Sequence, residues 1–227
     1  MAAVEELAAD SGSRHIEAVP SAANLRDIAK QNGFSASPNN IARISMPPSN
    51  TRRGHTAAWK LGADAAKVLR DQENLGDGPV VDPRLTDLLG VEKAALADNE
   101  SSKLGISFAL DHGNQSSRIV LRSKWLVGRR FDLARLLGDR LMATQSALYP
   151  ATRAYTYRQK AQRSFAAELL SPFNAVFNML EGDYSAENTL EVAEHFQVSE
   201  LTIRTQLVNH QILDRDDLDS DVFTQAA

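Results

Sequence analysis

The sequence predicts a mixed α+β fold that is mostly helical and contains one small antiparallel sheet. Along most of the chain, apolar residues recur three and four positions apart, which is the period of an amphipathic helix. Two short apolar segments, Gly105 to Leu110 and Arg118 to Leu121, are instead joined by the polar turn DHGNQSS, which is typical of a β-hairpin. With 227 residues, 43% of them hydrophobic, the chain is long enough to bury one ordinary core.

The helical period is clear from Thr56 to Gln72, where Leu61, Ala65 and Leu69 share a face. A turn at Gly76 to Pro79 follows it. Further helices are expected at Ala22 to Lys30, Pro83 to Leu89, Arg129 to Ala143, Tyr157 to Leu170, Phe173 to Leu180, Ala186 to Phe196 and Glu200 to Asn209. These elements divide the chain into an N-terminal arm or linker (1–51), one domain (52–213) and an acidic tail (214–227).

The composition limits the classes of protein that fit. The chain has no cysteine, which excludes disulfides, thiolate nucleophiles and cysteine-based zinc sites and suits a reducing cytosol. No apolar run approaches the length of a membrane span, and the acidic N-terminal sequence MAAVEELAADSG does not resemble a signal peptide. We therefore expect a cytoplasmic protein with no membrane partner.

Positive charge is concentrated in the middle of the chain. Between Gln115 and Phe165 there are eleven Lys and Arg against two acids, which is 11 − 2 = +9 in a chain whose net charge is −4. One interpretation is internal pairing with the acidic ends, and the other is a face for an anionic partner. The candidates for such a face are Arg129, Arg130, Arg153, Arg158 and Arg163.

Two segments have the order and spacing of a known peptidase family. The first is RIVLRSKWLVGRRFDLARLLGDRLM, and the second is SFAAELLSP followed by LEVAEHFQVSELTIRTQLVNHQIL. In these segments the chain resembles the ImmA/IrrE metallopeptidases, over roughly residues 55–213. The resemblance implies a zincin-like domain, in which a small antiparallel sheet packs on helices and a helical block follows.

In that family, a His-Glu-x-x-His helix supplies two zinc ligands and a general base, and a later helix supplies a carboxylate ligand. Aligned on this pattern, Arg135 stands at the first His, Leu136 at the Glu and Asp139 at the second His. Gln159 stands near the place of the third ligand. The resemblance therefore implies a degenerate site with no catalytic residues, no metal and no cofactor. We expect Arg135 and Asp139, one turn apart, to be in contact across the vacated groove.

The segment AEHFQVSELTIRTQLVNHQIL also resembles a DNA-reading helix-turn-helix. Its second helix would offer Arg204, Gln206 and Asn209 to base edges. However, this region also contains Glu200 and precedes the acidic tail, whereas binding to phosphates needs local positive charge. The alternative is a helix pair that packs on the domain.

The sequence therefore predicts a non-catalytic, ImmA/IrrE-like domain that binds a protein. As the resemblance implies, the partner would be a repressor, a toxin or another regulator in a phage, mobile-element, toxin–antitoxin or defence setting. One alternative is a transcriptional regulator that binds DNA through the basic middle or the C-terminal helix pair. A second alternative is a metallopeptidase with a non-standard site.

Overall fold

The computed structural model describes residues 3–13, 19–44, 56–97, 105–112, 116–143 and 146–216. The described helices are α1 (Ala3–Ser13), α2 (Ala22–Asn32), η1 (Pro38–Asn40), α3 (Ala58–Gln72), α4 (Asp82–Leu89), α5 (Ala94–Ala97), α6 (Leu126–Met142), α7 (Tyr157–Leu170), α8 (Phe173–Leu180), α9 (Ala186–Phe196) and α10 (Glu200–Asn209). The strands are β1 (Phe34–Ala36), β2 (Ser107–His112), β3 (Ser116–Val120) and β4 (Leu148–Ala151). The α+β class expected from the sequence is confirmed.

The four strands form one antiparallel sheet in the order β1-β3-β2-β4. The expected hairpin is present, since β2 and β3 pair from Phe108↔Val120 to His112↔Ser116. The edge strands were not predicted. β1 has only three residues, and β4 contains Pro150, a residue that is confined to edge strands because it cannot donate a ladder hydrogen bond.

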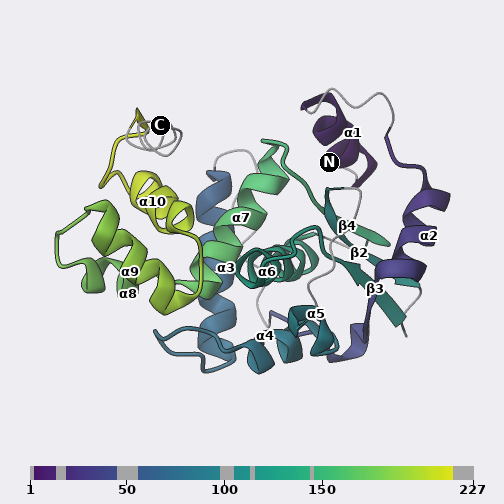
Figure 1. Cartoon of the computed structure of the whole chain (residues 1–227), viewed down its shortest axis with the longest axis horizontal. Coiled ribbons are helices and arrows are strands. Elements are labelled where there is room, and N and C mark those ends of the chain that lie inside the picture. Colours follow the sequence, from purple (N-terminus) through teal and green to yellow (C-terminus); the bar gives the residue numbers. More distant parts are fainter. Residues whose placement is uncertain are drawn as a thin grey trace.

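Both faces of the sheet are covered. On one face, Phe108 packs with Leu25 of α2 and Leu7 of α1. On the other face, Ala109 and Ile119 join the main core, which includes residues of α3, α6 and α7. Figure 1 shows α2 on the outer side of the sheet, α6 at the centre of the molecule and α8 to α10 on the far side of α3 and α7.

The segment expected as an N-terminal arm is part of the folded domain in its described ranges, 3–13 and 19–44. Strand β1 extends the sheet by pairing with β3, in the register Phe34↔Ile119 to Ala36↔Ser117. From α1, Glu6 and Asp10 are buried and accept hydrogen bonds from the Thr156 hydroxyl and the Arg153 amide. The sequence favoured a linker here because Pro- and Ser-rich stretches are typical of linkers. The contacts that fix this segment are to residues far along the chain, which local patterns do not show.

Two glycines let the central helices approach closely. A Cβ at Gly62 of α3 would lie 2.1 Å from the carbonyl oxygen of Ala161 in α7, and one at Gly138 of α6 would lie 2.4 Å from the Phe165 ring. No real Cβ sits that close to its neighbours, so any side chain at either position would force α7 away. This close packing positions the residues of α6 and α7 that the sequence analysis selected.

The helix boundaries in the C-terminal half agree with the sequence. Helices α7, α8, α9 and α10 begin and end at the expected residues, with side-chain caps from Thr156, Ser185 and Ser199. Helix α6 begins at Leu126, three residues before the expected start at Arg129. Within the described residues, none of the helices is both long and apolar enough to cross a membrane.

Candidate ligand-binding groove

The positions at which the resemblance places zinc ligands lie close together. Arg135 of α6 donates from Nη2 to Gln159 Oε1 of α7 at 2.6 Å and to the Thr152 carbonyl at 2.7 Å. The Gln159 side chain also bonds to the backbone. The Thr152 amide donates to its Oε1 at 2.9 Å, and its Nε2 donates to the Pro150 carbonyl at 3.0 Å. A guanidinium and an amide therefore occupy this space and are hydrogen-bonded to each other.

The expected contact between Arg135 and Asp139 is not formed. Instead, Asp139 accepts a two-pronged ion pair from Arg158 of α7, with Nε 2.7 Å from Oδ1 and Nη2 2.6 Å from Oδ2. The planar fork of an arginine fits a carboxylate in this way, so Arg158 outcompetes a partner on the same helix. Arg135 turns to Asp132 as well, with Nη1 3.7 Å from Oδ1.

These residues do not fit a zinc ion. Arg135 has no lone pair to offer a metal, Asp139 is already paired, and Leu136 is fully buried in the main core. In the described part of the chain, no three His, Asp or Glu side chains come together in a metal-binding group. His15 and His55 lie outside the described residues.

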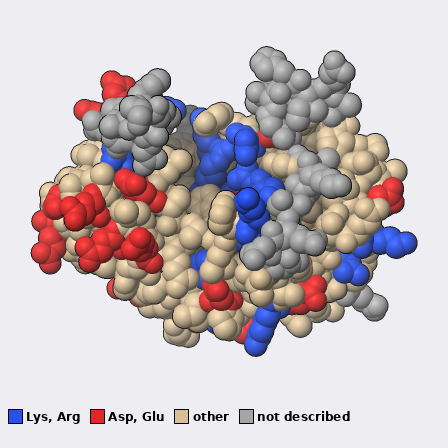
Figure 2. All heavy atoms as spheres, viewed as in Figure 1, with Lys and Arg blue, Asp and Glu red and all other residues tan. Residues whose placement is uncertain are grey.

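A groove of about 900 Å³, with Arg135 among its lining residues, lies between α6, α7 and α10. We call it the basic groove. Its cationic lining residues are Arg122, Arg135, Arg153, Lys160, Arg163 and Arg215, and Asp132 is the one acid among the described lining residues. Figure 2 shows these charges as a blue hollow in the middle of the face, beside a red surface to its left. The groove therefore attracts anions.

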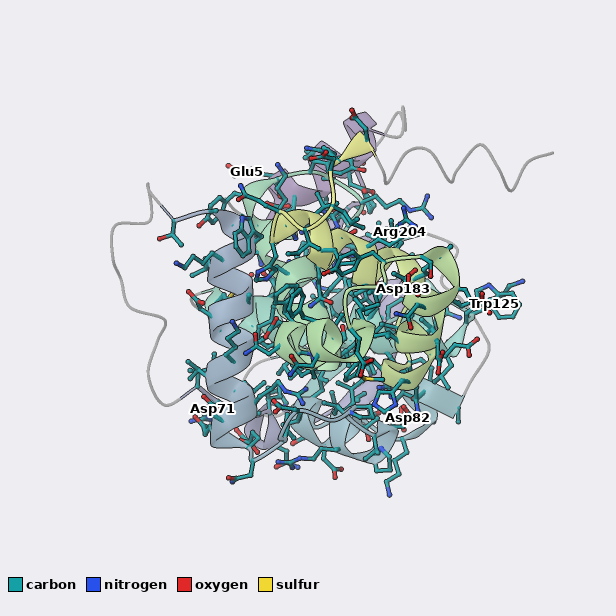
Figure 3. The ribbon with its side chains drawn as sticks, turned by 90° about the vertical axis from the view of Figure 1, so that its left-hand side faces the viewer. Glu5, Asp71, Asp82, Trp125, Asp183 and Arg204 are labelled. Carbon is teal, nitrogen blue, oxygen red and sulfur yellow. The ribbon has the colours of Figure 1, made fainter. Side chains whose placement is uncertain are left out.

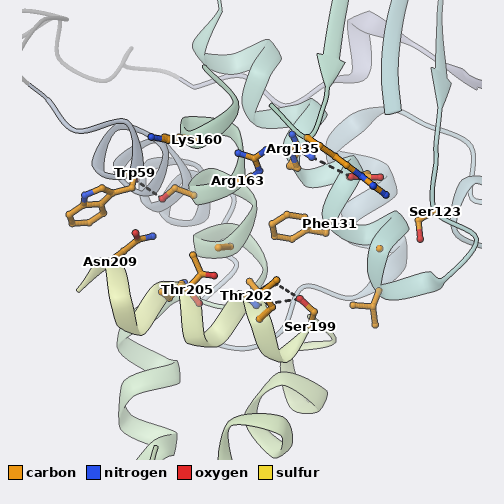
Figure 4. Close-up of a pocket in the computed structure, with 18 of the residues that line it drawn as sticks. Trp59, Ser123, Phe131, Arg135, Lys160, Arg163, Ser199, Thr202, Thr205 and Asn209 are labelled. Carbon is orange, nitrogen blue, oxygen red and sulfur yellow. Dashed lines mark hydrogen bonds and ion pairs between the residues drawn. The ribbon is translucent and has the colours of Figure 1, made fainter. Parts of the chain in front are cut away.

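The walls of the basic groove also carry aromatic and apolar side chains. Trp59 of α3 and Tyr155 lie among its lining residues, as do Phe131 of α6 and Leu201 of α10. Trp125, another lining residue, is 71% exposed and projects from the body of the protein (Figure 3). Figure 4 shows Trp59 and Asn209 at one end, Ser123 at the other, and Thr202 and Thr205 along α10. The groove can hold a ligand with both charged and apolar parts.

Three arginines stand close together at the inner wall of the groove. Burial lowers the pKa of Arg135 to about 9. The charge of Asp132 opposes this shift, and the charges of Arg163 and Arg122 add to it. Burial is also the largest cause of the lowered pKa of Arg163, to which Arg122 contributes in the same direction. The positive charges of these neighbouring guanidinium groups therefore repel one another.

The five arginines selected from the sequence do not form one surface. Arg129 and Arg130 are fully buried at the start of α6, and Arg158 is engaged with Asp139. Arg129 donates to the Ala95 and Ser123 carbonyls, and Arg130 donates to the Val80 carbonyl and pairs with Asp82. Only Arg153 and Arg163 line the basic groove. Internal pairing thus accounts for part of the basic middle.

Helix α10 is a wall of the groove, which conflicts with its use as a DNA-reading helix. Gln206 is 5% exposed and its side chain is bonded to the backbone and hydroxyl of Ser171. Arg204 pairs with Glu200 at 3.8 Å, and Asn209 lines the groove. The helix pair and its Ser199 cap are as predicted, but the candidate base-reading residues do not form an outward row.

The sequence analysis missed several residues of the groove. Trp59, Phe131, Tyr155 and Arg215 were not selected, because they come from four different segments and show no spacing pattern. Arg122 and Lys160 were counted in the basic middle but not chosen as candidates. The excess of positive charge was the one available signal, and it did not reveal which cations face the same space.

No family model, no curated protein and no solved structure matches this chain. The functional argument therefore depends on the residues and the geometry described above.

Proposed function

We propose that this chain is a non-catalytic, ImmA/IrrE-like regulatory module that binds an acidic segment of a partner protein in the basic groove. The observation that carries the proposal is the groove itself, whose described lining has six cations against one acid and includes Arg135, one of the positions to which the resemblance assigns a zinc ligand. If the chain shares the ancestry that the resemblance implies, a peptide-binding groove can persist while the loss of zinc ligands removes cleavage.

The lining supports an acidic segment with apolar residues in it. Lys160, Arg153 and Arg215 are exposed cations at the mouth and can pair with carboxylates. Leu201 and Trp125 are exposed at 62% and 71%, and they give apolar side chains of the partner a place to bury surface. The partner we propose is a repressor, a toxin or another regulator, in a phage, mobile-element, toxin–antitoxin or defence setting.

The test is a titration of a short labelled peptide of alternating Asp and Leu, followed by fluorescence anisotropy. The variant Lys160→Glu/Arg215→Glu should weaken binding by at least about tenfold, because it replaces attraction with repulsion at the groove. The matched control is Lys30→Glu/Lys93→Glu, which makes the same change in net charge at exposed residues that are not part of the groove lining. The affinity of this control variant for the peptide should stay within about twofold of that of the unchanged protein. Equal losses in the two variants would contradict the proposal.

A single-stranded nucleic acid is the second candidate, because exposed aromatic rings beside cations also suit stacked bases and phosphates. The same assay separates the two. An oligonucleotide that binds more tightly than the peptide, and loses affinity by orders of magnitude between about 50 and 200 mM salt, would favour the nucleic acid.

A further inference from the structure

Three guanidinium groups from three separate segments line the inner wall of the basic groove, and two of them, those of Arg122 and Arg135, pair with the carboxylate of Asp132. Arg122 follows β3, Arg135 lies in α6 and Arg163 lies in α7, and all three line the groove with Asp132. Asp132 accepts from Arg122 Nε at 3.1 Å and from the Ser107 hydroxyl at 2.7 Å. The cluster therefore carries 3 − 1 = +2 charges at neutral pH.

Much of the donor capacity of this cluster is unused within the described structure. The hydrogen bonds of the Arg122 side chain involve Nε, and those of Arg163 involve Nη2, which donates to the Thr152 and Ala154 carbonyls. Arg135 is 1% exposed, and its Nε has no hydrogen-bond partner among the described residues. The donors left for a ligand are therefore mainly the Nη atoms of Arg122 and Nη1 and Nε of Arg163, while Arg135 adds its charge to the inner wall.

The aromatic ring of Phe131 stands next to this cluster. Phe131 precedes Arg135 by four residues in α6, so the two side chains lie on the same face of the helix. Figure 4 shows Phe131 beside Arg163 and Arg135, on the wall that faces α10. A ligand held by the arginines would therefore place its next atoms against an apolar ring.

From this geometry we infer that Arg122, Arg135 and Arg163 form a subsite for the phosphoryl group of a phosphate monoester, whose organic part packs against Phe131. A phosphoryl dianion matches the +2 charge of the cluster, whereas a single carboxylate leaves half of it uncompensated. Its tetrahedral oxygens also suit donors that approach from three sides. The inference deepens the proposed function, since it concerns the chemistry of the ligand in the same groove.

The test uses phenyl phosphate as the probe and inorganic phosphate and benzoate as comparisons, with affinities from isothermal titration calorimetry. Phenyl phosphate should bind at least about tenfold more tightly than benzoate, because it carries the second charge and the extra acceptor oxygens. It should also bind more tightly than inorganic phosphate, because its ring contacts Phe131. Equal affinities for phenyl phosphate and benzoate would overturn the phosphoryl subsite. Equal affinities for the two phosphates would overturn the monoester.

Two variants locate the site. Arg163→Gln should weaken phenyl phosphate by at least about tenfold, because it removes a charged donor while keeping an amide to bond the Ala154 carbonyl. Phe131→Leu should weaken phenyl phosphate severalfold and leave inorganic phosphate unchanged. The matched control is Arg215→Gln, a cation at the mouth of the same groove. If Arg215→Gln and Arg163→Gln weaken phenyl phosphate equally, the cluster is not the subsite.

The outcomes are independent of those for the acidic peptide. If the peptide binds and phenyl phosphate does not, the subsite is refuted while the proposed function stands. If phenyl phosphate binds as expected and the peptide does not, the proposed partner is refuted while the subsite stands.

Discussion

The arginines at the start of α6 and the arginines of the basic groove belong to the same basic stretch of sequence, yet they have opposite roles. Arg129 and Arg130 are fully buried, and their charge is compensated by backbone carbonyls and by Asp82. Arg122 and Arg163 line a groove with other cations, and part of their donor capacity is unused within the described residues. This difference shows that a basic stretch of sequence gives the number of positive side chains. It does not show how many of them are accessible to a ligand.

The acidic side of the molecule reinforces this contrast. The exposed acids Glu181, Asp183, Glu187, Glu191 and Glu194 lie on and around α8 and α9. Figure 2 shows a red surface to the left of the blue groove, on the side where Figure 1 shows α8 and α9. Among the described residues, no ion pair joins these acids to the groove, so the groove keeps its positive potential at its own surface.

The largest expected effect is the loss of stability on removing one of the buried arginines at the start of α6. Arg130→Ala should lower the free energy of unfolding by about 3 kcal/mol, because it leaves the Val80 carbonyl unpaired, breaks the ion pair with Asp82 and opens a cavity. Urea unfolding followed by circular dichroism measures the change. Arg153→Ala, in an exposed groove residue, is the control and should change stability by no more than about 0.5 kcal/mol. Similar losses in the two variants would remove the distinction between the two groups.

A smaller effect is expected from pH on the groove side. Phenyl phosphate should bind severalfold more tightly at pH 7.5 than at pH 5.5, because its second pKa, near about 6, makes it a dianion only at the higher pH. Affinity should fall again above pH 9, where Arg135, whose pKa burial and its neighbours lower to about 9, loses its proton. Calorimetry from pH 5.5 to above pH 9 tests both the rise in affinity and the later fall.

The charged groups around Arg135 bear on which group causes each change in affinity. Those that act on Arg135 are Asp132, Arg163, Arg122 and Asp139. Those that act on Arg163 are Tyr155, Arg122, and Glu6 and Asp10 of α1. No histidine belongs to the described lining of the groove. A rise in affinity between pH 5.5 and 7.5 therefore comes from the ligand. If affinity fell over this interval instead, a group of the protein would control binding, and the dianion would not be the bound form.

The smallest expected effect concerns metal. Purified protein should contain less than about 0.1 zinc per chain, and a chelator should leave its melting temperature unchanged, because Arg135 and Leu136 cannot ligate zinc and Asp139 is held by Arg158. Elemental analysis and thermal unfolding with and without the chelator measure both. One zinc per chain would revive the metallopeptidase with a non-standard site.

Local patterns predicted most of the helices and the central hairpin. The bounds of α7, α9 and α10 follow from capping residues and from helical spacing, which are properties of neighbouring residues. Strands β1 and β4 were missed because a short edge strand takes its conformation from the strand beside it, and three or four residues carry too little pattern. Helix α5, four residues long, was missed for the same reason.

The sequence by itself determined the fold class, the helices other than α1 and α5, and the identity of the side chains at Arg135, Leu136 and Asp139. Only the tertiary structure decided which partner each charge takes. Asp139 pairs across to α7 and not along its own helix, and Arg122 and Arg163 meet although they are far apart in the chain. The physical reason is range, because helical periodicity is a local property, whereas burial and charge pairing depend on how the packed helices bring distant residues together.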